Sequence, residues 1–141
     1  RKEDKNPNRK GAELLELRAK GEGDVAVVFH FPSSDIEEFS VKIGVFSNRF
    51  PGMEKFDLIL PCATFVEKKG TWTNFEGRVQ KFYKAVDPVP ESLEEGRILQ
   101  LFSELKGIAM EWNVNLWFAR FAERISLKVD FENFPPEGVK L

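Results

Sequence analysis

Residues 24–60 read DVAVVFHFPSSDIEEFSVKIGVFSNRFPGMEKFDLIL and hold three short apolar segments separated by turn-forming residues. The apolar segments cover residues 24–31, 41–47 and 57–60. Their aliphatic and β-branched content favours strands, and the continuous apolar run of the first is typical of a strand buried on both faces. Strands alternating with short helical or turn segments predict a βαβ-type, doubly wound sheet. The connections are short for parallel crossovers, so the strand order stays open.

The residues around these strands supply turn and cap signals. Residues 32–35 (PSSD) read as a turn and a helix N-cap, and residues 53–55 as a short helical turn. Pro61 is expected to end the third strand. Further on, residues 70–80 (GTWTNFEGRVQ) predict two extended pieces around a turn, in which Gly77 can take a positive φ without a steric penalty from a Cβ.

Three segments have helical patterns. Residues 11–20 suit a short helix ended by glycine, and residues 115–125 form an apolar helical segment. The clearest helix is expected over residues 91–106, with acids at its start and Gly107 after its end. Its predicted apolar face consists of Leu93, Ile98, Leu101, Phe102 and Leu105. The tail from Asp130 is expected to be irregular.

Composition limits the classes of function. The chain has 141 residues and a formal net charge of −2, which gives no reason to expect a nucleic-acid partner. No apolar run is long enough to span a bilayer, so direct membrane insertion is not expected. A single cysteine indicates a reducing, cytoplasmic compartment. Because the chain starts at Arg1 without Met, we expect it to be processed or cut from something longer.

Few residues are suited to catalysis or metal binding. A cluster or a structural zinc site usually needs about four Cys or His ligands, and this chain has only Cys62 and His30, so no metal site and no catalytic residues are expected. His30 is interpreted as a hydrogen-bonded core or strand-end residue, and Cys62 as a small buried hydrophobic residue. The consecutive pair Glu94 and Glu95 is interpreted as solvated helix surface.

One polar cluster follows the third strand. Its members are Thr71, Thr73, Asn74, Glu76, Arg78 and Gln80. Ligands of open α/β sheets bind at the carboxyl ends of strands, and Arg78 could hold a phosphate or carboxylate by two-point contact. The alternative is a polar turn whose side chains satisfy their own backbone, with Arg78 pairing to Glu76 or to a neighbouring domain. Residue types alone favour this alternative.

Residues 57–80 (DLILPCATFVEKKGTWTNFEGRVQ) resemble the signature of the molybdopterin oxidoreductase superfamily. Within it, Glu76-Gly77-Arg78 looks most like the large iron–sulfur subunit of NADH–quinone oxidoreductase (complex I), since formate dehydrogenases more often have another residue at Gly77. The flanks at residues 8–12 and 84–88 agree, and the resemblance covers roughly residues 6–107.

The resemblance implies an α/β fold with a Rossmann-like sheet of three or more mainly parallel strands flanked by helices, an extended-turn insertion and C-terminal helices. The implied domain covers residues 24–107, between a polar lead-in with a short helix (1–23) and a C-terminal helix with an irregular tail (108–141). The implied function is a structural, non-catalytic domain of a complex I subunit that supports electron transfer from NADH to quinone.

The resemblance also sets expectations for cofactors and partners. Iron–sulfur clusters belong to the rest of the parent subunit, and this chain itself carries no cofactor. The alternative function is a pterin-binding domain of a molybdenum or tungsten oxidoreductase such as formate dehydrogenase, with a molybdopterin guanine dinucleotide. In that case the cofactor contacts fall on Thr73, Asn74, Glu76, Arg78 and Gln80. The implied partners are other domains and subunits of an oxidoreductase complex, peripheral to the inner membrane on its cytoplasmic side.

Overall fold

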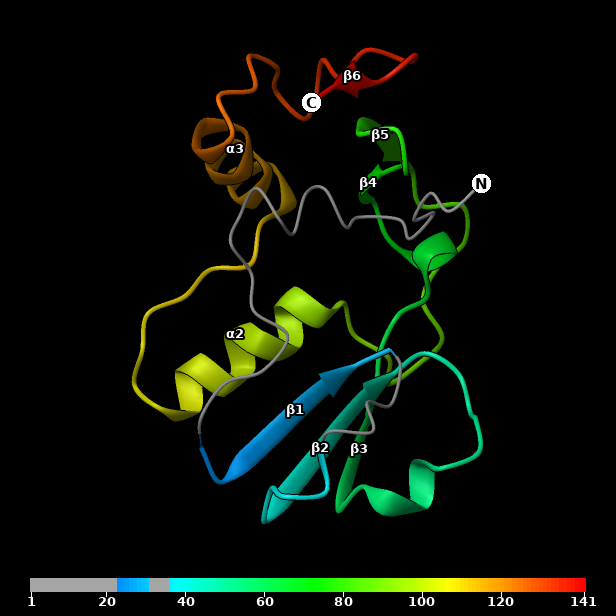
Figure 1. The fold of residues 1–141 in the computed structure, drawn as a ribbon, viewed down its shortest axis with the longest axis vertical. Helices are drawn as coiled ribbons and strands as arrows, with labels where there is room; N and C mark the ends of the chain where they lie inside the picture. The colour runs from blue at the N-terminus through cyan, green and yellow to red at the C-terminus, as the bar shows by residue number, and fades with distance from the viewer. Residues whose placement is uncertain (1–22, 31–35) are drawn as a thin grey trace. The chain divides into compact units, whose positions relative to one another are not determined.

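The computed structural model describes residues 23–30 and 36–141 (Figure 1). By their contacts these residues form two compact units. The parallel-sheet unit comprises residues 23–30, 36–68 and 85–109, and the hairpin unit comprises residues 69–84 and 110–141. The elements of the parallel-sheet unit are β1 (Val25–Phe29), β2 (Val41–Phe46), η2 (Met53–Lys55), β3 (Leu58–Pro61), η3 (Phe65–Glu67) and α2 (Glu95–Leu105). Those of the hairpin unit are β4 (Gly70–Thr73), β5 (Arg78–Phe82), α3 (Val114–Arg124) and β6 (Val139–Lys140).

The three apolar segments predicted as strands form one parallel sheet in the order β1-β2-β3. The α/β class is therefore confirmed, and the strand order that the sequence left open is sequential. Parallel strands place all their carboxyl ends at one edge of the sheet, where β1, β2 and β3 end side by side (Figure 1). This edge is the one at which open α/β sheets bind ligands.

Each face of the sheet has its own apolar cluster. Val45 is fully buried and packs with Cys62 and with Ile98 of α2, so this cluster joins the helix to the sheet. The other cluster contains Ala26, Ile36, Phe46 and Phe56. The ring of Phe46 meets Phe56 edge-on with a centroid separation of 4.9 Å, a favourable geometry for aromatic pairs.

Burial of β1 differs from the prediction. Val25 is 51% exposed and Val27 40% exposed, whereas Ala26 between them is buried. Buried and exposed side chains therefore alternate at the start of the strand, whereas Phe29, on the same side as Val25 and Val27, packs against the Val45 cluster. The continuous apolar run did not distinguish this pattern from burial on both faces. Two predictions, the helix over residues 11–20 and the cap at residues 32–35, lie outside the described residues.

Helix α2 begins later than the sequence suggested. Residues 91–94 precede it, and Leu93 instead forms a parallel bridge to Cys62, with Ala63 N donating to Leu93 O at 2.9 Å. Pairing of Leu93 with the sheet edge thus prevents the helix from starting earlier. The predicted apolar face is correct for Ile98 and Phe102, but Leu105 is 83% exposed.

The hairpin unit confirms the predicted turn between extended pieces. Strands β4 and β5 pair antiparallel, and β6 adds to β5 through the pairs Arg78–Lys140 and Val79–Val139. The tail is therefore not wholly irregular. Gly138 has a φ of +80°, and a Cβ there would lie 2.4 Å from Val79 O, so the approach of β6 to β5 requires glycine.

A single cluster fills the hairpin unit. Val79 of β5 is fully buried against Phe118 and Ala122 of α3 and against Phe131 and Phe134 of the tail. Helix α3 starts one residue before its predicted first residue, 115, and buries Phe118 and Ala122 in this cluster. None of the helices described is long and apolar enough to cross a membrane.

Candidate functional site

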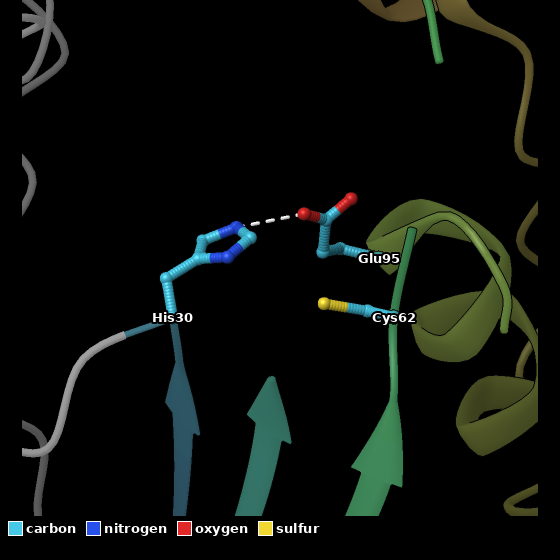
Figure 2. A group of neighbouring side chains, drawn as sticks. All are labelled: His30, Cys62 and Glu95. Atoms are coloured by element: carbon cyan, nitrogen blue, oxygen red, sulfur yellow. Dashed lines mark ion pairs between the residues drawn. The ribbon is translucent and has the colours of Figure 1, made fainter. Parts of the chain in front are cut away.

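Three side chains with metal-binding or catalytic potential meet at the carboxyl edge of the parallel sheet. His30 directly follows β1, Cys62 directly follows β3, and Glu95 is the first residue of α2. One donor atom from each lies within 4.8 Å of the other two. Figure 2 shows the His30 ring directed toward the Glu95 carboxylate and the Cys62 sulfur pointing into the space between these two side chains. The arrangement combines a nitrogen, a sulfur and an oxygen donor.

The backbone holds these residues in place. His30 N donates to Val45 O at 3.0 Å, and Cys62 N donates to Phe46 O at 3.0 Å, so both residues remain tied to β2 after their own strands end. His30 adopts a φ of +67°, an uncommon left-handed conformation for a residue with a side chain. Unusual backbone conformations cluster at functional sites. The strand-end interpretation of His30 is confirmed, and the side chain is exposed rather than part of a core.

Glu95 is the electrostatic centre of the group. Its Oε1 lies 2.7 Å from His30 Nε2 and also pairs with Lys68 Nζ, and its side chain is only 19% exposed. Lys68 is likewise largely covered, with a side chain 16% exposed. The prediction that Glu95 belongs to a solvated surface is therefore wrong for this carboxylate.

Cys62 is buried, as predicted, with 3% of the residue exposed. Burial, and secondly the negative charge of Glu95, raises the pKa of its thiol to about 11. The thiol is thus protonated at neutral pH in this state, which argues against a resident nucleophile because thiolates are the reactive form. A bound cation would change that balance, since a coordinating thiol loses its proton.

The polar cluster predicted after the third strand lies in the hairpin unit. Asn74 begins the turn, and its Oδ1 accepts hydrogen bonds from Glu76 N at 3.0 Å and Arg78 N at 2.9 Å. Arg78 Nη1 donates to Glu137 O at 3.3 Å. These contacts agree with the alternative of a turn that satisfies its own backbone, while Glu76 and Gln80 are exposed.

The two faces of the hairpin separate the predicted cofactor contacts. Residues directly opposite each other in an antiparallel pair point to the same side, and neighbours along a strand to opposite sides. Thr73 is paired with the buried Val79, and Trp72 with the exposed Gln80. Arg78 and Gln80 therefore share the outer face with Trp72, and Thr73 faces the core. Whether any of these residues contacts a cofactor stays a prediction.

Gly77 has a conformational reason to be glycine. Its φ is +79°, and its N–H donates to Asn74 O at 2.9 Å, which closes the turn between β4 and β5. The left-handed conformation there accounts for glycine on steric grounds alone. Gly77 is therefore a poor indicator of one branch of a family over another.

Residues 45–105 match the family model described as molybdopterin oxidoreductase. This segment runs from the second-to-last residue of β2 to the end of α2 and contains both Cys62 and Glu95 as well as the β4–β5 hairpin. The resemblance suggested by the sequence is thus found over this segment, which is less than half of the chain.

Several curated proteins similar to this chain are named as formate dehydrogenases. The alpha subunit of an F420-dependent formate dehydrogenase from Methanocaldococcus jannaschii is 44% identical over 59 residues, which is 42% of this chain and 9% of that protein. A putative formate dehydrogenase from Staphylococcus aureus is 37% identical over 57 residues, which is 40% of this chain and 6% of that protein. The similarity thus spans under a tenth of the length of either relative. These relatives favour the alternative function from the sequence analysis, a domain of a formate dehydrogenase, over a domain of a complex I subunit.

Proposed function

We propose that this chain is part of the pterin-binding region of a molybdenum or tungsten oxidoreductase of the formate dehydrogenase kind. The match of residues 45–105 to the molybdopterin oxidoreductase family carries this proposal. The identity of 44% to the alpha subunit of an F420-dependent formate dehydrogenase supports it over a complex I subunit.

The outer face of the hairpin fits the guanine dinucleotide part of such a cofactor. Arg78 provides up to five N–H donors, of which the contact with Glu137 O uses one, and planar guanidinium groups suit phosphate oxygens. Gln80 offers an exposed amide with both a donor and an acceptor. Trp72, 40% exposed and opposite Gln80, offers a flat surface on which a purine can stack.

The remaining predicted contacts have different roles. Asn74 is already engaged by two backbone N–H groups, and buried Thr73 lies on the inner face. Both therefore shape the hairpin that presents Arg78 and Gln80. When bound, a molybdenum or tungsten pterin supplies two-electron redox chemistry at its metal, and the residues described here bind and orient the nucleotide end.

Metal and pterin analysis of the intact parent protein tests the proposal. We expect stoichiometric molybdenum or tungsten and an extractable guanine dinucleotide pterin. Substituting Arg78→Met in the parent is expected to lower the pterin content, whereas Lys128→Met, which removes an exposed cation of the same hairpin unit, leaves it unchanged. Iron without molybdenum, tungsten or pterin would contradict the proposal and support the complex I scaffold instead.

A further inference from the structure

The proposed pterin binding gives no role to the group formed by His30, Cys62 and Glu95. Each residue comes from a different element, and the donor atoms converge within 4.8 Å at the edge of the parallel sheet (Figure 2). The first and last of them are more than sixty residues apart in the sequence. Their convergence is a product of the fold.

The types of donor atom indicate which kind of metal ion the group would bind. Imidazole nitrogen, thiolate sulfur and carboxylate oxygen are the three ligand types of protein-bound zinc. Calcium and magnesium prefer sites made of oxygen atoms, so the sulfur and nitrogen donors disfavour them. Three protein ligands with a fourth position open to water is a common arrangement at zinc sites.

We propose that His30 Nε2, Cys62 Sγ and Glu95 Oε1 bind one Zn²⁺ ion, with a water molecule as the fourth ligand. Around a tetrahedral zinc ion the ligand atoms lie about 3.3–3.8 Å apart, given bonds of about 2.0–2.3 Å. The present separation of 2.7 Å between His30 Nε2 and Glu95 Oε1 has to widen by about 0.6–0.8 Å, because both of these ligand atoms form the shorter bonds. Side-chain rotation alone can supply a change of this size.

The residues around the three ligands hold Cys62 in place and leave a path by which a metal ion can enter from solvent. Cys62 is fixed by packing against Val45 and Ile98, and its backbone is paired on both sides, with Phe46 and with Leu93. His30 has a side chain 40% exposed, which gives an ion access from solvent. On binding, the Cys62 thiol releases its proton to water, and the Nε2 proton of His30 is lost or moves to Nδ1.

Lys68 competes with a metal ion for the Glu95 carboxylate. Its ammonium group pairs with the same Glu95 oxygen that the ion would bind, so zinc has to displace this contact. A cation held next to the site also repels a second cation. Lys68 therefore lowers the metal affinity of this site.

Cobalt titration of the full chain tests the site. Because the chain contains one cysteine and one histidine, a thiolate-to-cobalt absorption band can arise only from Cys62. We expect one Co²⁺ per chain, such a band, and its loss when Zn²⁺ is added. Cys62→Ser abolishes the band, His30→Ala weakens affinity by at least about tenfold, and Glu95→Gln does the same. Glu104→Gln, an exposed acid of the same helix, leaves affinity unchanged.

Lys68→Met gives a result in the opposite direction. This variant is expected to bind Co²⁺ and Zn²⁺ several-fold more tightly, which a loss of folding cannot imitate. Circular dichroism of each variant confirms that it is folded. The proposal is overturned by the absence of a thiolate band in the unmodified chain, by a band that survives in Cys62→Ser, or by weaker binding in Lys68→Met. The test does not depend on pterin binding.

Discussion

At the scale of single residues, Glu67 shows how one carboxylate connects two segments. Its Oε2 accepts from Thr64 N at 2.7 Å and its Oε1 from Val89 N at 3.2 Å. With Thr64 it forms a capping box for the short helix η3. The residue is 8% exposed, and the hydrogen bond from the backbone of Thr64 is the main cause that lowers the pKa of its carboxyl below 4.5.

A lowered pKa makes the contribution of Glu67 to stability depend on pH. The charged form is stabilised in the folded chain, so its contribution is present above pH 4.5 and is lost as the pH falls through the lower folded value. We expect Glu67→Gln to lower the Tm at pH 7, and the difference from the unmodified chain to shrink below pH 4.5. Thermal unfolding across this range measures both effects.

Glu111→Gln is the matched control for that experiment, because Glu111 is exposed. It should leave the Tm nearly unchanged at both ends of the pH range. A Glu67→Gln variant whose loss of stability is the same at every pH would show that the carboxylate charge has no part in the effect.

At the scale of elements, helix ends are decided by polar caps and by competing pairings. Helix α3 begins after Asn113, whose Oδ1 accepts from Asn115 N at 3.0 Å and Leu116 N at 3.3 Å. Helix α2 has no such side-chain cap, and its start follows the bridge between Leu93 and Cys62. The first boundary is encoded locally, and the second depends on the sheet edge.

Removing the cap of α3 should destabilise the hairpin unit. Asn113→Ala leaves two backbone N–H groups without their acceptor and is expected to cost about 1 kcal/mol. That change corresponds to a Tm lower by roughly 3–5 °C. Asn113→Asp keeps an acceptor at the helix N-terminus and should retain most of the stability. Equal losses in both variants would mean that the cap does not stabilise the helix.

At the scale of the whole molecule, the two compact units have separate apolar clusters, two in the parallel-sheet unit and one in the hairpin unit. In the hairpin unit, Phe118 is 5% exposed and its ring lies 5.5 Å from that of Phe131 and 5.6 Å from that of Phe134. Residues 110–141 therefore pack with β4 and β5 and complete a common core. All four phenylalanines of residues 110–141 belong to this cluster or pack against it.

Deleting the central ring tests the importance of this core. Phe118→Ala is expected to lower the free energy of unfolding by about 3–5 kcal/mol, because the change removes buried apolar surface and leaves a cavity. Phe75→Ala in the same unit removes a ring that is 47% exposed and should change stability by less than about 0.5 kcal/mol. Urea denaturation of both variants gives the comparison, and similar values for the two would contradict the assignment of the core.

Most regular elements could be predicted from the sequence, because their signals are local. Apolar runs identified β1, β2 and β3, and the glycine and asparagine of the turn identified the hairpin. The pairing of residues 139–140 with β5 could not be predicted, since a two-residue strand has no periodicity of its own. The domain boundaries at residues 24 and 107 stay a prediction.

The sequence by itself determined the α/β class, the parallel strands and the polar hairpin, because side-chain periodicity and turn chemistry act over a few neighbouring residues. Only the tertiary structure decided that His30, Cys62 and Glu95 meet, since these residues lie more than thirty positions apart in the sequence and each follows or begins a different element. Parallel pairing aligns the carboxyl ends of β1 and β3, and the bridge from Cys62 to Leu93 brings the first turn of α2 to that edge. A glutamate that looks like solvated surface in the sequence thereby becomes a largely covered partner of a histidine, a lysine and a cysteine.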